Sequence, residues 1–265
     1  MSEIPARRGI QSIEIAFRLL QVLQASRRPL PLKEIAAGAG MSPSAANNYL
    51  VSLVRTGLAA TDGKPGHYRL GSSAVALGMS AIQQIDGFEI ARQEVTALRD
   101  TTRHSAAVTA WTDDGPVSLF KQEGDWRSAL ELRTGLLSIT ATAAGKVFAA
   151  CLPEAATLPL IGRERGTGAT ATLSGPAIVE AARREMREAG YVVVRRDDGT
   201  GYASAAAPVR DWSGGIRFAL SIIGSQNSLS TERGSAEVRE LLACAARATA
   251  ALGGAAQMSA DPASG

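Results

Sequence analysis

Histidine and cysteine, which commonly act in nucleophilic catalysis or bind metal ions, are scarce in this 265-residue chain. Its two histidines are His67 and His104, and its two cysteines are Cys151 and Cys244. Neither cysteine has a Cys or His neighbour at a metal-ligand spacing, so both are expected to be small buried apolar side chains in a reducing compartment. The sequence therefore predicts no metal site and no cofactor.

The segment that follows Pro43 carries side chains of a different kind, suited to contacts with DNA. At about 100° per residue it forms a helix whose apolar side holds Ala46, Leu50, Leu53 and Val54. The opposite side holds Ser44, Asn48, Ser52 and Arg55. Short polar side chains on an outward face suit a helix that enters the major groove, although the pattern alone also fits an ordinary solvated helix.

A short hairpin is predicted directly after this helix. Two extended runs, 58–61 and 67–70, flank a turn rich in Gly, Pro and Asp. Basic side chains on this hairpin would contact the phosphate backbone, although His67 is equally suited to capping or stacking within the hairpin. The predicted DNA-binding residues are Ser44, Ala45, Asn47, Asn48, Ser52, Arg55, Lys64, His67 and Arg69.

Two earlier helices must position the DNA-facing helix. The first is predicted to begin after Ser12, a suitable cap, and to pack through Ile13, Phe17, Leu20 and Leu23. The second is short and covers 32–36. The third begins with Ser42 as cap and Pro43 in its first turn, where a missing N–H is no loss. Three helices and a hairpin make a winged helix-turn-helix.

Charge is divided unevenly along the chain. Residues 1–80 contain nine Lys or Arg and four Asp or Glu side chains, whereas the remainder contains 19 and 21. A basic front indicates a polyanionic partner, here double-stranded DNA. The N-terminal residues lack the apolar core of a secretory signal, and no stretch has the roughly 20 apolar residues of a membrane span. A cytoplasmic protein without membrane contact is expected.

Several separate motifs occur in the order found in one known family. They are the segments 40–44, 49–53, 68–71, 142–146, 190–191 and 206–211. Over roughly residues 10–252 the chain resembles the isocitrate lyase regulator (IclR) family of bacterial transcription factors. The resemblance implies a homodimer or tetramer that binds an operator through paired winged helices and responds to a small anionic metabolite, as a repressor or an activator.

The DNA-facing helix departs from the pattern of that family. Where many members have Lys-Ser-Thr at its start and a His-Arg pair within it, this chain has Pro43-Ser44-Ala45 and Asn47-Asn48. The Asn48 amide cannot make the forked contact of arginine with guanine, but it matches N6 and N7 of adenine. We therefore expect an operator unlike those of better-known members.

The predicted organisation has five parts: a flexible arm (1–9), the winged helix-turn-helix (10–71), a helical linker (72–98), an effector-binding domain (99–252) and a disordered tail (253–265). The linker forms one helix, or two broken near Asp86-Gly87, whose apolar stripe suits either a dimer contact or its own domain. Beyond it we expect strands at 106–111, 117–122, 129–133, 191–195, 204–209 and 217–223. Helices are expected at 143–152, 176–189 and 231–252. The fold class is α+β, with a mainly antiparallel sheet flanked by helices.

A second candidate site lies where the 143–152 helix begins. Thr142 is suited to cap this helix, and the small side chains after it leave the first N–H groups open to a carboxylate. Close packing of the helix on the sheet explains the same small residues. A nucleotide-binding P-loop is excluded, because Thr140 and Val147 stand where that motif needs glycine and a hydroxyl.

The family resemblance extends this site to the later strands. It implies that Ser204 and Ser221 line a pocket for a small organic or aromatic acid. The predicted effector-binding residues are Thr140, Thr142, Ala143, Ala144, Gly145, Ser204 and Ser221. Val194 or Arg195 stands where the family is usually acidic; the cost of burying an unpaired guanidinium favours a solvent-facing Arg195 over one that binds the ligand.

Two other functions are considered. An enzyme acting on a small carboxylate, with an accessory DNA-binding segment, would need Cys151 or Ser221 to meet His104 by coincidence, or Lys146 to act as base. The sequence therefore predicts no enzyme. An architectural DNA-binding protein would use the rear domain only for assembly, and the small residues at 143–145 argue against it.

Overall fold

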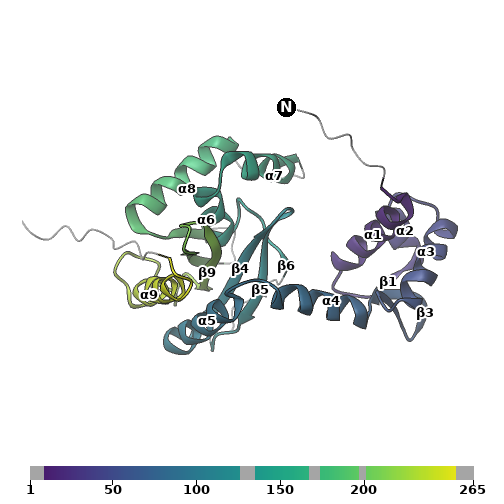
Figure 1. The fold of residues 1–265 in the computed structure, drawn as a ribbon, viewed down its shortest axis with the longest axis horizontal. Helices are drawn as coiled ribbons and strands as arrows, with labels where there is room; N and C mark the ends of the chain where they lie inside the picture. The colour runs from purple at the N-terminus through teal and green to yellow at the C-terminus, as the bar shows by residue number, and fades with distance from the viewer. Residues whose placement is uncertain (1–8, 126–134, 167–173, 197–200, 255–265) are drawn as a thin grey trace, which may run out of the picture. The chain divides into compact units, whose positions relative to one another are not determined.

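The computed structural model describes residues 9–125, 135–166, 174–196 and 201–254, whose elements are labelled in Figure 1. The predicted arm (apart from Gly9), the strand at 129–133 and most of the predicted tail lie outside these residues. The described chain divides into two units between Asp86 and Gly87. None of the helices described is long and apolar enough to cross a membrane.

The first unit contains the predicted three helices and hairpin. Its elements are α1 (Gln11–Gln24), α2 (Leu32–Gly38), α3 (Pro43–Arg55), β2 (Ala59–Asp62), β3 (Lys64–Leu70) and α4 (Ser72–Gln83). A two-residue strand, β1 (Leu30–Pro31), pairs with the other side of β3, so the antiparallel sheet has the order β1-β3-β2. The sequence did not predict β1, because two residues between helices carry no periodic signal.

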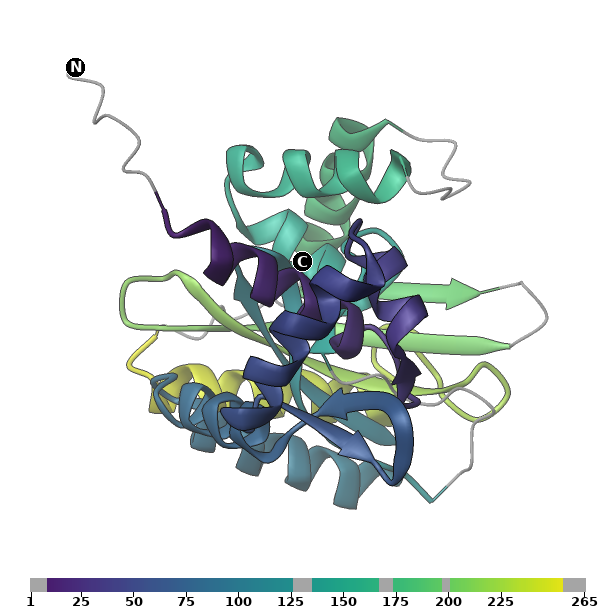
Figure 2. The same cartoon turned by 90° about the vertical axis from the view of Figure 1, so that its right-hand side faces the viewer.

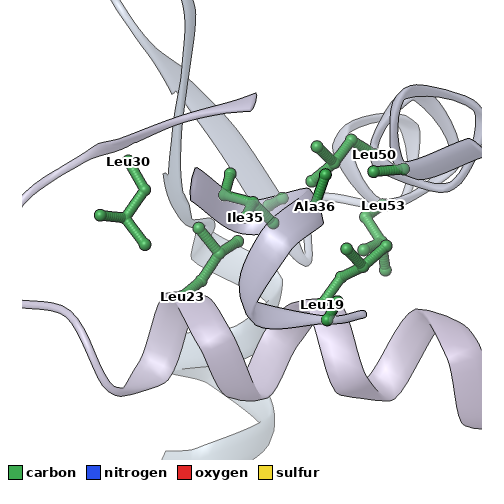
Figure 3. Packing of buried hydrophobic residues seen from close by; sticks show 10 residues of the cluster. Leu19, Leu23, Leu30, Ile35, Ala36, Leu50 and Leu53 are labelled. Carbon is green, nitrogen blue, oxygen red and sulfur yellow. The ribbon is translucent and has the colours of Figure 1, made fainter. Parts of the chain in front are cut away.

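The core of this unit lies where α1, α2 and α3 meet. Leu19 and Leu23 of α1 pack with Ile35 of α2 and with Leu50 and Leu53 of α3 (Figure 3). Each of these side chains is at most 5% exposed. The hydrophobic residues of α3 therefore orient the helix and leave its other side outward.

The prediction for α1 was wrong in its cap and partly wrong in its buried face. Ile10 precedes the helix and makes no side-chain cap, so Ser12 lies inside α1. Ile13 and Phe17 are 64% and 56% exposed, whereas Leu19 and Leu23 are buried. The sequence of α1 contains two overlapping apolar faces, and packing against α2 and α3 selects the one that includes Leu19.

The predicted connecting segment consists of two helices. The first, α4, has no buried residue and exposes Val75, Leu77 and Met79. The second, α5 (Phe88–Thr102), begins after Gly87, whose φ of +79° ends the preceding turn. Residues Ala91 and Val95 of α5 are buried within the second unit. The break near Asp86-Gly87 is thus confirmed.

The second unit contains a six-stranded antiparallel sheet of order β6-β5-β4-β9-β8-β7. Its strands are β4 (Ser105–Thr112), β5 (Gly115–Gln122), β6 (Gly135–Leu136), β7 (Val192–Arg196), β8 (Tyr202–Arg210) and β9 (Ile216–Ser225). Its helices after α5 are α6 (Ala143–Cys151), α7 (Glu154–Gly166), α8 (Gly175–Ala189) and α9 (Ala236–Ala251). In Figures 1 and 2, α6, α7 and α8 lie on one side of the sheet and α5 and α9 on the other.

Most predicted elements of this unit are present, with three differences. The sequence analysis did not predict β6 or α7. Helix α7 contains Pro159, and a proline inside a helical pattern usually indicates that the helix ends. The last helix begins after Ser235, whose side chain accepts from the Val238 N–H, rather than at Thr231. The α+β class with an antiparallel sheet is confirmed.

Candidate nucleic-acid interface and effector site

Helix α3 has a defined start and a defined end. The Ser42 side chain accepts from the Ala45 N–H at 3.3 Å, and Pro43 occupies the first turn, as predicted. Gly57, with φ of +73°, turns the chain toward β2. A side chain at position 57 would be strained at this φ, so the helix has a defined end.

The four residues predicted to face outward are all exposed. They are Ser44, Asn48, Ser52 and Arg55. Ser52 Oγ donates to the Asn48 carbonyl at 3.4 Å, which directs this hydroxyl along the helix. Ala45 and Asn47 are half-buried on the flank of the helix. The exposed face of α3 is therefore free of the unit's own core.

Sequence reasoning missed one residue on this face. Val51 is 49% exposed, and its helical angle places it beside Ser44 and Asn48. An apolar side chain there suits contact with a thymine methyl group. The helical angle could have identified it, but its residue type suggested the core.

The predicted residues of the wing differ in their surroundings. Arg69 is exposed on β3, and its Nε lies 3.5 Å from an Asp62 carboxylate oxygen. His67 is half-buried, with Nδ1 3.4 Å from the Pro65 carbonyl oxygen, a contact within the hairpin. The Lys64 side chain lies outside the part that the structure describes. Arg69 is thus the described cation best placed for a phosphate contact.

The start of α6 is tightly packed. Thr142 caps the helix as predicted, because its Oγ1 accepts from the Gly145 N–H at 3.0 Å. Ala143 and Ala144 are buried against the sheet. A Cβ added at Gly145 would lie 2.6 Å from the Ile139 Cα. The small size of these three residues therefore serves close packing, whichever ligand the site takes.

The loop before α6 already holds a carboxylate. The Glu164 side chain of α7 accepts from the Ile139 N–H at 2.6 Å, the Ser138 hydroxyl at 2.9 Å and the Thr140 hydroxyl at 3.0 Å. The Thr140 N–H adds a fourth hydrogen bond at 3.3 Å. The sequence could not indicate Glu164, because α7 itself was not predicted.

Ser204 and Ser221 lie on the sheet face that α6 covers. Ser204 pairs with Val194, and Ser221 with Ala206; both partners belong to the cluster packed against α6. Directly opposed residues of an antiparallel pair share a face. Thr109, which sequence reasoning missed, pairs with Ala219 of the same cluster and adds a third hydroxyl.

Two of these hydroxyls have unsatisfied hydrogen-bonding capacity. Ser204 Oγ and Thr109 Oγ1 are buried and make no well-formed hydrogen bond within the described residues. Burial raises the pKa of the adjacent Tyr202 phenol, and a loose contact with the Ser204 hydroxyl, which lacks the geometry of a full hydrogen bond, lowers it by less. Buried polar atoms without partners are uncommon, and a ligand on this face could form hydrogen bonds with both hydroxyls.

Arg195 faces away from these hydroxyls. Side chains alternate between the two faces of the sheet along β7, so Arg195 lies on the face away from the buried Val194, and its side chain is exposed. Its Nε and Nη2 donate to Thr231 Oγ1 at 3.1 and 2.8 Å. The structure therefore agrees with the solvent-facing alternative. The neighbouring Arg196 stacks over the Tyr202 ring, with Cζ 6.0 Å from its centroid.

The candidate nucleophile Cys151 has a cation beside it. Arg210 Nη2 donates to its Sγ at 3.4 Å. Burial raises the pKa of the Cys151 thiol, more than the arginine lowers it. A raised pKa makes the reactive thiolate scarce near neutral pH, which is unfavourable for nucleophilic catalysis.

Comparison with known proteins identifies the family. The model of the IclR helix-turn-helix domain matches residues 12–63, and that described as "Bacterial transcriptional regulator IclR C-terminal" matches residues 79–251. A glycerol operon regulatory protein of Streptomyces griseus is 30% identical over 220 residues, which cover 77% of this chain and 80% of the relative.

Solved structures share the fold. An IclR transcriptional regulator from Alicyclobacillus acidocaldarius matches with a TM-score of 0.76 and 23% identity, over 93% of this chain and all of that one. An IclR homolog from Microbacterium hydrocarbonoxydans, complexed with 4-hydroxybenzoate, matches with a TM-score of 0.71 and 19% identity, over 91% and 98%.

These matches span both units of the chain. Curated relatives carry the names of transcriptional regulators and repressors, so the protein is a regulator and not an enzyme. Regulators of this kind bind DNA and small-molecule effectors. The chain therefore belongs to the IclR family of bacterial transcriptional regulators.

Proposed function

We propose that this regulator binds an operator half-site through α3 and changes its affinity for DNA when a small organic or aromatic acid binds its second unit. The observation that carries the DNA contact is the exposed α3 face of Ser44, Asn48, Ser52 and Arg55, opposite a buried one. Ala45, Asn47 and Val51 extend the contact, and Lys64, His67 and Arg69 position the wing on phosphates.

The effector site we propose lies beside the start of α6, on the sheet face that this helix covers. Thr140, Thr142 and the small residues 143–145 form one side, and Ser204, Ser221 and Thr109 supply hydroxyls from the sheet. The 4-hydroxybenzoate bound by the Microbacterium neighbour supports an aromatic acid as the first ligand to test. An effector acts by binding the DNA-competent and DNA-incompetent states with different affinity.

Two measurements test this function. Selection of genomic DNA fragments with the full chain is expected to enrich one operator sequence. Thermal unfolding with a panel of carboxylic acids, including 4-hydroxybenzoate, is expected to show a raised melting temperature for at least one acid. Absence of any enriched fragment would contradict DNA recognition by α3, and enrichment without a response to any acid would contradict the proposed effector class.

We also propose a homodimer that forms through α4. This helix carries no charged side chain and no buried residue, yet exposes Val75, Leu77 and Met79. An apolar helix that its own domain leaves uncovered is typical of an interface. Two copies would present two α3 helices to two half-sites.

Leu77→Glu is expected to shift the protein from dimer toward monomer and to weaken operator binding. A carboxylate at this position would have to be buried without a partner when the copies associate. Sedimentation or light scattering over a range of concentrations measures the change. Leu136→Glu is the matched control, since Leu136 is 55% exposed on β6 in the second unit, and it is expected to leave the dimer intact. Equal effects of both variants would refute an α4 interface.

A further inference from the structure

One carboxylate of the second unit is bound as a ligand would be. Both oxygens of Glu164 accept hydrogen bonds from a loop that lies 24 to 26 residues earlier in the chain. Oε1 accepts from the Ile139 N–H, whereas Oε2 accepts from the Ser138 hydroxyl and from both donors of Thr140. Four donors of this loop thus converge on one anion.

Contacts that do not involve Glu164 hold this loop in place. Ser138 Oγ accepts from the Ala141 N–H at 3.0 Å, and the Ser138 carbonyl accepts from Thr142 Oγ1 at 2.7 Å. Ile139 is 1% exposed and packs with residues of α6, α7 and α8. Gly145 lets the loop lie directly against α6. The donors are therefore positioned before any anion arrives, which lowers the entropic cost of binding one.

The donor set selects the chemical class of the ligand. Two of the four groups are backbone N–H groups, which only donate, and the two hydroxyls rotate to donate as well. Such a set favours an anion with two oxygens over a cation or an apolar group, and hydrogen bonds to a carboxylate are the stronger kind.

We propose that Ser138–Thr140 is a carboxylate-binding cradle whose resident ligand is Glu164, and that an external carboxylate replaces Glu164 when that side chain is removed or displaced. In the intact protein Glu164 ties α7 to the loop before α6. Any acid that reaches the Thr140 donors must compete with a tethered carboxylate, whose effective concentration is on the order of millimolar or more.

The cradle shares a residue with the proposed effector site. Thr140 belongs to the proposed effector site, so an acid that takes its donors releases α7 from the loop. That consequence for regulation rests on the proposed function, whereas the existence of the cradle does not.

Chemical rescue tests the cradle in the full-length protein. Glu164→Ala vacates the four donors, and formate is the probe, because it is the smallest carboxylate. The melting temperature of Glu164→Ala is expected to rise saturably with sodium formate, beyond the change in sodium chloride of equal ionic strength. Adding Thr140→Val removes one hydroxyl donor and is expected to weaken or abolish the rescue.

The matched control is Glu180→Ala. Glu180 is an exposed helical glutamate that pairs with Arg187 at 2.8 Å on α8. This variant and the wild type are expected to respond equally to formate and chloride. If Glu164→Ala does not fold in chloride buffer, refolding is the second readout, and sodium formate is expected to recover folded protein that sodium chloride of equal ionic strength does not recover.

The proposal is overturned if formate neither stabilises nor refolds Glu164→Ala better than chloride does, or if it stabilises the Glu180→Ala control as much. The readout involves neither DNA nor the effector. A failed fragment selection together with a successful rescue would therefore reject the proposed DNA contact and keep the cradle, and the reverse result would reject only the cradle.

Discussion

Replacing Asn48 by alanine is expected to weaken operator binding by about 5- to 150-fold, the equivalent of roughly 1–3 kcal/mol for one amide-to-base contact. The Asn48 side chain is exposed on the outward face of α3, where an amide can pair with N6 and N7 of one adenine. Its loss is also expected to relax sequence preference at that one base pair, while non-specific binding changes little.

Titration of operators that differ at single base pairs measures this effect. Arg69→Ala provides the contrast, because Arg69 is exposed on the wing and is suited to phosphate. It is expected to weaken binding to all sequences alike and to reduce the slope of log K against log salt by about 0.9. If Asn48→Ala binds every operator variant like the wild type, α3 does not enter the groove by this face.

Gly145→Ala is expected to destabilise the second unit by about 1–3 kcal/mol, the usual cost of overpacking. The added Cβ would lie 2.6 Å from both the Cα and the carbonyl oxygen of Ile139. These are backbone atoms, which cannot rotate away as a long side chain does. The loop must therefore shift, and the hydrogen bonds to Glu164 weaken with it.

Gly162→Ala is the matched control for this substitution. Gly162 is exposed within α7, and a Cβ there meets nothing within 4 Å. Alanine forms helix more readily than glycine, so this variant is expected to gain stability, by up to about 1 kcal/mol. Denaturant unfolding followed by circular dichroism compares the two. Equal free energies of unfolding for the two variants would show that the loop before α6 can shift to accept a Cβ at Gly145 without loss of stability.

Local sequence signals were sufficient where an element carries its own start, face and end. Helix α3 has all three, in the Ser42 cap, the buried Leu50 and Leu53, and the Gly57 turn. The same holds for the long strands of the second unit, whose antiparallel class was predicted. Capping and periodicity act between neighbours in the chain, so they can be read without knowing the fold.

Local signals failed where one helix offers two apolar faces of similar quality, or where a residue within a helix is of a type that usually ends one. Helix α1 contains two apolar faces, and only contact with α2 and α3 decides that Leu19, rather than Phe17, is buried. Helix α7 contains the exposed Pro159, which argues against a helix, and only the packing of Leu160 and Ile161 with residues of α6 and α8 favours one.

The winged helix-turn-helix, the outward face of α3 and the α+β class could be predicted from the sequence, because short-range hydrogen bonds and side-chain periodicity specify them. Two features became evident only from the fold: Thr109 shares a sheet face with Ser204 and Ser221, and Glu164 binds the Ser138–Thr140 loop. Both facts depend on strand register and helix docking between distant segments. Such pairings are set by the packing of the whole unit, and no local pattern records them.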